Sequence, residues 1–162
     1  MLYNSMSGVS DRCGPGTDIT HTEILSQSLQ GSNSVTDLTL MNCGLTSTAV
    51  EVIAEAVLKM GNLRFINLFR NDGMDDAGLH KLMEAVETSS VQTVSGLKEN
   101  AEVANYSELG LSSMDAKIVA ADIKLARFSK GLKSISMRST GDRNKATTYV
   151  LKKDSTDVKL KK

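Results

Sequence analysis

The stretch LRFINLFRND, residues 63–72, carries the pattern that decides the fold. Leu63, Ile66 and Leu68 follow the spacing L-x-x-L-x-L, and an asparagine, Asn71, stands three residues after the last of them. Side chains of a β-strand point alternately to its two faces, so this spacing predicts a strand with one apolar, buried face.

The same pattern occurs 28 residues earlier, in VTDLTLMNCGLTSTAVEVIAEAV, residues 35–57. The later copy, residues 63–86, has one extra residue just after its asparagine, and Cys43 of the first copy aligns with Asn71 of the second. In each copy the apolar spacing changes from the alternation of a strand to the i, i+3, i+4 spacing of a helix. The sequence therefore predicts two strand-then-helix repeats.

A strand-then-helix unit of this length resembles a leucine-rich repeat of the ribonuclease-inhibitor-like class, and the resemblance covers about residues 20–140. It implies an α/β fold, a short solenoid with a parallel sheet on the concave side and helices on the convex side. It also implies that the side chains of Cys43 and Asn71 cap backbone groups in the turn that leaves each strand.

The third repeat is irregular. Val91 and Val94 predict a strand in SVQTVSG, and its helix is expected at LSSMDAKIVAADI, residues 111–123. Residues 97–110 then form an insertion, which we expect to be a loop or an extra turn of helix.

The two ends of the repeat region are predicted from local signals. Residues 18–31, DITHTEILSQSLQG, predict a helix with Leu25 and Leu29 buried and with Asp18 or Thr20 as its N-cap.

The C-terminal part predicts a fourth strand in LKSISMRST, residues 132–140, and a closing strand or hairpin in ATTYVLKK, residues 146–153. We therefore expect three parts: a poorly ordered segment 1–17, a repeat domain 18–145, and a β-rich cap with a basic tail, 146–162.

Composition favours an ordinary globular protein of the cytoplasm. Of the 162 residues, 40% are hydrophobic and 23% are charged, and 19 basic residues balance 19 acidic ones. This balance gives no overall field that favours nucleic acid or a membrane surface. Cys13 and Cys43 are too few for a disulfide framework, and no apolar run approaches the roughly 18 residues of a membrane span.

The sequence contains no recognisable catalytic or metal-binding motif. His21 and His80 are the only histidines, and together with Cys13 and Cys43 they lack the paired spacing of a zinc site. We therefore expect a non-catalytic protein without a cofactor or a metal.

Binding residues are expected on the face of the strands opposite the apolar ladder. That face receives Phe65 and Phe69, two of only three phenylalanines, together with Thr93 and Ser95 of the third strand. Aromatic, methionine and arginine side chains are enriched in protein interfaces. The candidate residues for binding another protein, as a monomer or a weak dimer, are Asp37, Met41, Arg64, Phe65, Asn67, Phe69, Arg70 and Arg138.

Several alternatives remain open. Residues 97–110 or the C-terminal segment would cover the two phenylalanine rings if either folded back over the second strand. A shift of the strand register by one residue would expose the apolar ladder, and we discount it. Two other functions are alternatives to passive binding. One is regulation of an enzyme such as a small GTPase through Asn67 or Arg70, and the other is capping of actin in the manner of tropomodulin. The chain also begins on a helix without a strand, which suits a fragment of a longer protein.

Overall fold

The computed structural model describes residues 19–138 and 146–150, and it describes Arg138 and residues 146–150 by their backbone alone. The predictions for residues 1–17 and for the basic tail after residue 150 lie outside the described residues. The chain forms two compact units, unit 1 (residues 1–96) and unit 2 (residues 97–162), so a boundary falls within the repeat domain expected over 18–145.

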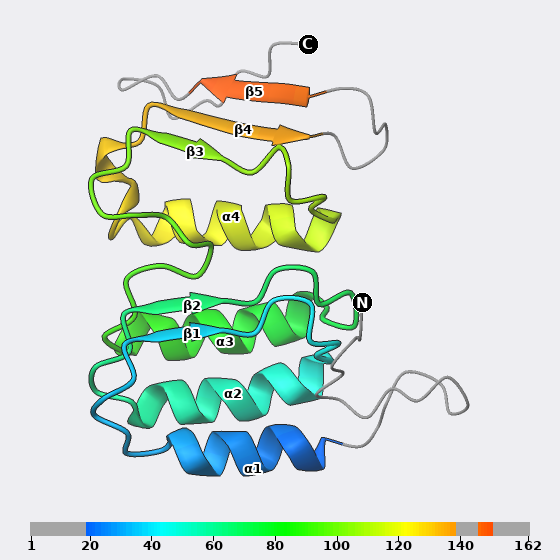
Figure 1. The fold of residues 1–162 in the computed structure, drawn as a ribbon, viewed down its shortest axis with the longest axis vertical. Coiled ribbons are helices and arrows are strands. Elements are labelled where there is room, and N and C mark those ends of the chain that lie inside the picture. The colour runs from blue at the N-terminus through cyan, green and yellow to red at the C-terminus, as the bar shows by residue number, and fades with distance from the viewer. Residues whose placement is uncertain (1–18, 139–145, 151–162) are drawn as a thin grey trace. The chain divides into compact units, whose positions relative to one another are not determined.

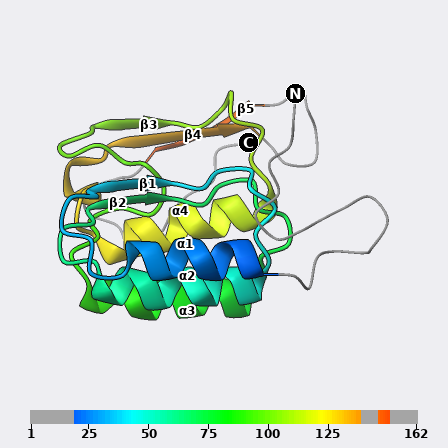
Figure 2. The same ribbon diagram turned by 60° about the horizontal axis from the view of Figure 1, so that its bottom comes forward.

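Unit 1 alternates helices and strands, as the repeat predicts. Its three helices lie side by side in one layer, and its two strands pair in parallel in a second layer (Figures 1 and 2). This arrangement confirms a mixed α/β fold. In chain order the elements are α1 (Thr20–Leu29), β1 (Asp37–Thr39), α2 (Ser47–Lys59), β2 (Phe65–Asn67) and α3 (Asp76–Thr88).

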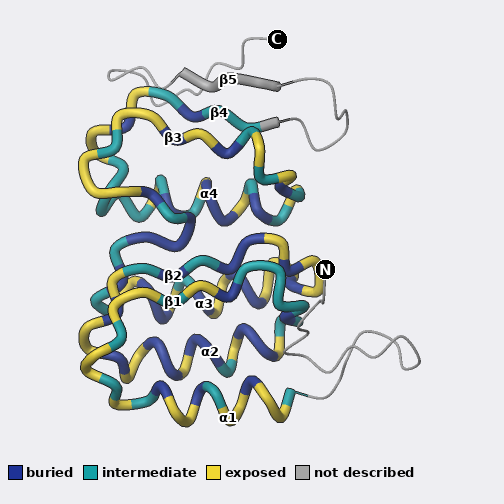
Figure 3. Tube along the Cα trace, in the orientation of Figure 1, coloured by how far each residue is buried: buried dark blue, intermediate teal, exposed yellow. Residues whose placement is uncertain are grey.

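The apolar positions of the two repeats form the core of unit 1 (Figure 3). Leu63, Ile66 and Leu68 are completely buried, and so are Ile53 and Val57 on the inner face of α2. Each side chain of this kind stabilises the fold by about 1.5–3 kcal/mol when it leaves water. The predicted buried face of the strand at residues 63–68 is therefore confirmed.

Asn71 joins the turns of the two repeats. Its Oδ1 accepts hydrogen bonds from the backbone N–H groups of Cys43 and Leu45, both at 3.0 Å. Its Nδ2 donates to the carbonyl oxygens of Leu40 at 2.9 Å and Leu68 at 2.7 Å. One buried side chain thus satisfies four backbone groups, and the capping role that the resemblance implies for Asn71 is confirmed.

Side-chain caps begin both repeat helices and also join them. The Thr46 side chain accepts a hydrogen bond at the start of α2, and the Asp75 carboxylate accepts one from the Gly78 N–H, at 3.0 Å, at the start of α3. Ser47 Oγ donates to the same Asp75 carboxylate at 2.6 Å and accepts from the Asp75 N–H at 2.9 Å. The first backbone N–H groups of a helix lack partners inside it, and the caps supply acceptors for them. The Ser47–Asp75 hydrogen bonds also link the start of α2 to the start of α3.

The N-terminal helix differs in detail from its prediction. Ile19 is the N-cap of α1 and makes no side-chain capping hydrogen bond, so the prediction of Thr20 as N-cap is wrong, and the alternative, Asp18, lies outside the described residues. Leu29 is buried as expected, whereas Leu25 is only half-buried. Small polar residues of α1 occupy part of the buried face of the helix, which leaves Leu25 at its margin.

The predicted third strand is only partly formed. Residues 91–95 lie beside β2, where Thr93 forms an isolated parallel bridge with Phe65 and Ser95 an isolated antiparallel bridge with Asn67. Thr93 and Ser95 are 0% and 2% exposed, so the prediction that they lie on the accessible surface is wrong. Their bridges put them beside Phe65 and Asn67, the outward positions of β2, but neither side chain is accessible there.

Unit 2 contains one further strand-then-helix segment and a closing strand. β3 and β4 pair in parallel, and β5 pairs antiparallel with β4, so the predicted fourth strand and the strand after it are both confirmed (Figure 1). In chain order the elements are β3 (Val103–Asn105), α4 (Ser113–Leu125), the 3₁₀ helix η1 (Ser129–Gly131), β4 (Ser134–Arg138) and β5 (Ala146–Val150).

The predicted insertion at 97–110 is wrong, because it contains β3. Ala104 within this strand and Tyr106 just after it are each 6% exposed, whereas Val103 is 62% exposed. An alanine and a tyrosine give a weak apolar signal, and for this reason the sequence pattern does not reveal the strand.

Candidate protein-binding surface

The outward positions of β1 and β2 form a small patch on unit 1. The parallel register sets Asp37 beside Phe65 and Thr39 beside Asn67. Asp37 and Thr39 are exposed, and Phe65 and Asn67 are half-buried. We call these four residues the β1–β2 face, and it brings together three of the predicted binding residues.

Two charged residues neighbour Phe65: Asp37 is its partner in the strand register, and Arg64 precedes it in the chain. The Asp37 carboxylate accepts a hydrogen bond from the Thr36 hydroxyl at 2.6 Å and remains exposed. Arg64 is also exposed, while its backbone is held on both sides: its N–H donates to the Thr36 carbonyl at 2.8 Å and its carbonyl accepts from the Gln92 N–H at 2.7 Å. A fixed backbone with a solvated guanidinium suits a contact to a carboxylate of another molecule.

The Phe65 ring is partly covered by unit 1 itself. A Cβ atom built on Gly96 would lie 3.4 Å from Phe65 Cζ, so the backbone at Gly96 lies against the edge of the ring. Gly96 has φ +79°, a conformation that favours glycine. The remainder of the ring is accessible, which leaves an aromatic side chain that can lose further surface to a partner.

Phe69 does not belong to this surface, and its prediction as a binding residue is wrong. The side chain is 0% exposed, and it is among the largest fully buried side chains of the described part. β2 ends at Asn67, whose Oδ1 accepts a hydrogen bond from the Phe69 N–H at 3.0 Å, and Arg70 follows with φ +62°. The chain turns here, so the alternation of faces stops before Phe69 and both Leu68 and Phe69 are buried.

Met41 and Arg70 lie in the two turns at the ends of β1 and β2. Met41 is half-buried and Arg70 is exposed. Asn42, with φ +57°, donates its N–H to the Phe69 carbonyl at 2.9 Å, which links the first turn to the second. Both residues therefore border the β1–β2 face and do not form its centre.

The role of Asn67 is mainly structural. Its carboxamide oxygen holds the turn that follows β2, and Asn105 does the same in unit 2 by accepting from the Ser107 N–H at 3.0 Å. Asparagine commonly closes such turns on its own backbone. The oxygen of Asn67 is thus already in use within unit 1.

Arg138 belongs to unit 2, and its side chain lies outside the described residues. The outward face of β3 instead presents Val103, which sequence reasoning missed because it assigned this residue to an insertion. Lys133, next to β4, forms an ion pair with Glu102 at 2.6 Å and is solvent-exposed.

The described residues contain no group of three or more His, Cys, Asp or Glu side chains that could hold a metal ion. Burial raises the pKa of the Cys43 thiol, so the thiol stays protonated at neutral pH and is a poor nucleophile. Across the described part of the chain, no helix combines the length and the apolar character that crossing a membrane requires.

Comparison of the chain with models of known protein families, with curated proteins and with solved structures gave no match.

Proposed function

We propose that the chain is a short leucine-rich-repeat solenoid that binds a partner protein through the β1–β2 face, without catalysis. The observation that carries this proposal is the half-buried Phe65 in register with exposed Asp37 and next to exposed Arg64. A partly accessible aromatic ring and an exposed arginine are residue types enriched in protein interfaces.

The repeat geometry supports the first part of the proposal. Equivalent turns of the two copies are held together by Asn71, and both strands begin a unit that continues into a capped helix. In leucine-rich repeats a residue at this position has that capping role, and the exposed strand face is the usual surface for partners.

The size of the surface bears on the strength of binding. Complete burial of Phe65 would add up to about 1.5–3 kcal/mol, and less in practice because the ring is already half-buried. Asp37 and Arg64 would mainly select a partner with complementary charges and speed its association.

A regulatory role towards a small GTPase has weaker support. It requires the carboxamide of Asn67 or the guanidinium of Arg70 to reach into the partner's site. The Asn67 oxygen already closes the turn after β2. Passive binding makes no such demand on either residue.

Site-specific photo-crosslinking tests the proposal. A photoreactive amino acid is placed at Thr39 on the β1–β2 face and, as a control, at Gln27, which is exposed on α1. Both variants are irradiated in lysate, and adducts are identified by mass spectrometry. We expect a distinct protein adduct from position 39 that is absent from position 27. The same adducts from both positions, or none from position 39, would count against the β1–β2 face.

A further inference from the structure

The helical layer of unit 1 contains a cleft that the sequence did not suggest. It lies between α2 and α3 and has a volume of about 420 Å³. The two helices are 13 residues long each. At about 1.5 Å per residue, they provide walls of roughly 20 Å, which is the length of three to four turns of another helix.

The floor of the cleft is apolar and is formed by small side chains. Ala54 and Ala85 line it and are 5% and 3% exposed, so small side chains lie where the helices come together. Leu58 stands at one wall with 56% of its surface exposed, and it is one of three large hydrophobic side chains exposed in the described residues. An apolar side chain placed over the two alanines would cover Leu58 and remove both partners' surfaces from water.

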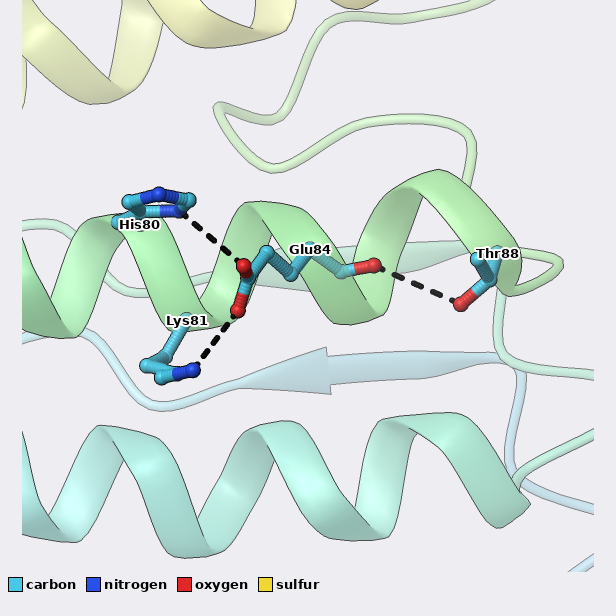
Figure 4. A network of polar contacts seen from close by, with 4 residues as sticks. All are labelled: His80, Lys81, Glu84 and Thr88. Carbon is cyan, nitrogen blue, oxygen red and sulfur yellow. Dashed lines mark hydrogen bonds and ion pairs between the residues drawn. The ribbon is translucent and has the colours of Figure 1, made fainter.

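The rim of the cleft is acidic. Glu51 and Glu55 line it from α2, and Glu84 lines it from α3, against a single lysine, Lys81. Lys81 donates to Glu84 at 3.0 Å, and His80 lies 3.8 Å from the other oxygen of the same carboxylate (Figure 4). Glu55 has no hydrogen-bond or ion-pair partner among residues 19–138. The rim therefore keeps a negative excess.

Lys81 and Glu84 of the rim stabilise each other's charged forms. The hydrogen bond and charge of Lys81 hold the pKa of Glu84 below its ordinary value, and Glu84 in turn raises the pKa of Lys81. Glu51 also attracts Lys81 through space. The cleft thus has an apolar floor between walls that carry three carboxyl side chains and one lysine.

We propose that the α2–α3 cleft docks a basic amphipathic helix of another protein. An apolar side chain of that helix lies over Ala54 and Ala85, and lysine or arginine side chains face Glu51, Glu55 and Glu84. The occupant is helical because two side-by-side helices form a straight groove that receives a third helix as a ridge. It is basic because the rim has unbalanced carboxylates. This surface lies on helices, so it is separate from the β1–β2 face and does not depend on the function proposed for that face.

A pair of synthetic peptides tests the proposal on the whole chain. The probe is an N-acetylated, C-amidated 14-residue helix with leucine at i, i+3, i+4 and i+7 and lysine on its polar face. The comparison peptide has glutamate in place of every lysine. Fluorescence anisotropy gives both affinities at low and at high salt, and backbone amide shifts in NMR spectra of the unmodified protein locate the contact. We expect binding of the lysine peptide only, with weaker binding at high salt, and shifts concentrated on α2 and α3.

Charge-matched variants separate the cleft from general electrostatic attraction. Glu51→Lys/Glu55→Lys reverses two charges at the rim, and Asp72→Lys/Glu99→Lys reverses two exposed charges elsewhere. We expect the first variant to lower the affinity for the lysine peptide at least about tenfold and the second to lower it less than about twofold. Leu58→Ser should weaken it as well, without any change of net charge.

Three results would overturn the proposal. One is equal weakening by the two charge variants, and another is a set of NMR shifts spread over other acidic surfaces. The third is absence of binding by the unmodified protein. The NMR result stands even if a variant fails to fold.

Discussion

At the scale of single residues, Asn71 connects the two repeats, because its carboxamide bonds backbone groups that follow both β1 and β2. Its four hydrogen bonds join backbone groups of residues 40, 43, 45 and 68, which are far apart in the sequence. Asn71 is itself 2% exposed, so water cannot easily replace it. An asparagine at this position of the repeat therefore has a direct physical role, which is to bond the turns of both copies.

Asn71→Ala should destabilise the protein by about 2–4 kcal/mol, because buried backbone donors and acceptors lose their partners. Urea unfolding followed by circular dichroism measures the change. Asn62→Ala is the matched control: Asn62 is exposed and makes one hydrogen bond, to the Asn33 carbonyl at 2.7 Å. The control should cost under about 1 kcal/mol. Equal costs for the two variants would show that Asn71 does not hold the turns together.

The two phenylalanines should respond differently to truncation. Phe69→Ala removes a fully buried ring and should cost about 3–5 kcal/mol. Phe65→Ala removes a half-buried ring and should cost clearly less, under about 1.5 kcal/mol. Thermal or urea unfolding of both variants measures this difference. A larger loss for Phe65 than for Phe69 would reverse the assignment of the two rings.

At the scale of elements, α3 depends on the ionised side chain of Asp75. The hydrogen bond from the Ser47 hydroxyl, and then that from the Gly78 N–H, hold the pKa of Asp75 below its ordinary value. Because the folded pKa is lowered, this stabilisation is present above the ordinary aspartate pKa of about 3.9 and is lost as the pH falls below it.

Asp75→Asn tests this dependence. Asparagine retains a capping oxygen but does not titrate, so the variant lacks the contribution that acid removes. We expect the stability difference between wild type and variant to be constant from about pH 7 to pH 5 and to narrow between about pH 4 and pH 2. Urea unfolding at each pH measures it. A difference that stays unchanged across the whole range would mean that the Asp75 carboxylate has no lowered pKa.

The close approach of α2 and α3 depends on Gly78. A Cβ atom there would lie 3.0 Å from Ser47 Cα and 3.0 Å from Ser47 Oγ. Helix propensity alone favours alanine over glycine by up to about 1 kcal/mol. We expect contact with the backbone of Ser47 to outweigh this, so that Gly78→Ala destabilises the protein by about 1 kcal/mol or more.

Gly61→Ala is the control for this substitution. Its nearest neighbour, Asn33 Oδ1, would lie 3.9 Å from the added carbon, and its effect should stay within about 0.5 kcal/mol. Urea unfolding compares the two variants. If Gly78→Ala stabilised the protein, the two helices would be further apart than the structure has them.

The sequence predicts elements well where apolar side chains are large and regularly spaced. Leu63, Ile66 and Leu68 define β2 and its buried face, and the change of period predicts α2 and α3. The pattern does not predict β3 because the buried residues in and just after this strand are Ala104 and Tyr106, which give a weak apolar signal. Strand alternation predicts Phe69 on the outward face, but the strand ends at Asn67. The Asn67 side chain bonds the Phe69 N–H in the turn that follows, and Phe69 is buried.

At the scale of the whole molecule, the division into two units is not visible in the pattern. The strand-like residues 91–95 and β3 follow each other without a helix between them, and the boundary falls between Gly96 and Leu97. Because the repeat pattern expects a helix after each strand, it predicts an insertion where two strand-like segments follow each other directly. The acidic cleft was also beyond sequence reasoning, since it depends on the distance between two helices and on small residues at their contact.

The two proposed surfaces of unit 1 differ in chemistry. The β1–β2 face combines an aromatic ring with one acidic and two uncharged polar side chains, whereas the α2–α3 cleft is acidic around an apolar floor. A protein that uses both would bind two different partners, or two parts of one partner, on strands and on helices.

The most direct measurement of the central claim is the dissociation constant of the partner crosslinked from Thr39, for three forms of the protein. Wild type is compared with Phe65→Ser and with Ile24→Ser, which removes another accessible apolar side chain, 58% exposed on α1. Circular dichroism confirms that each variant is folded. We predict that Phe65→Ser weakens binding by about tenfold, while Ile24→Ser changes it by less than about twofold. Unchanged affinity for folded Phe65→Ser, or an equal loss for both variants, would contradict binding through the β1–β2 face.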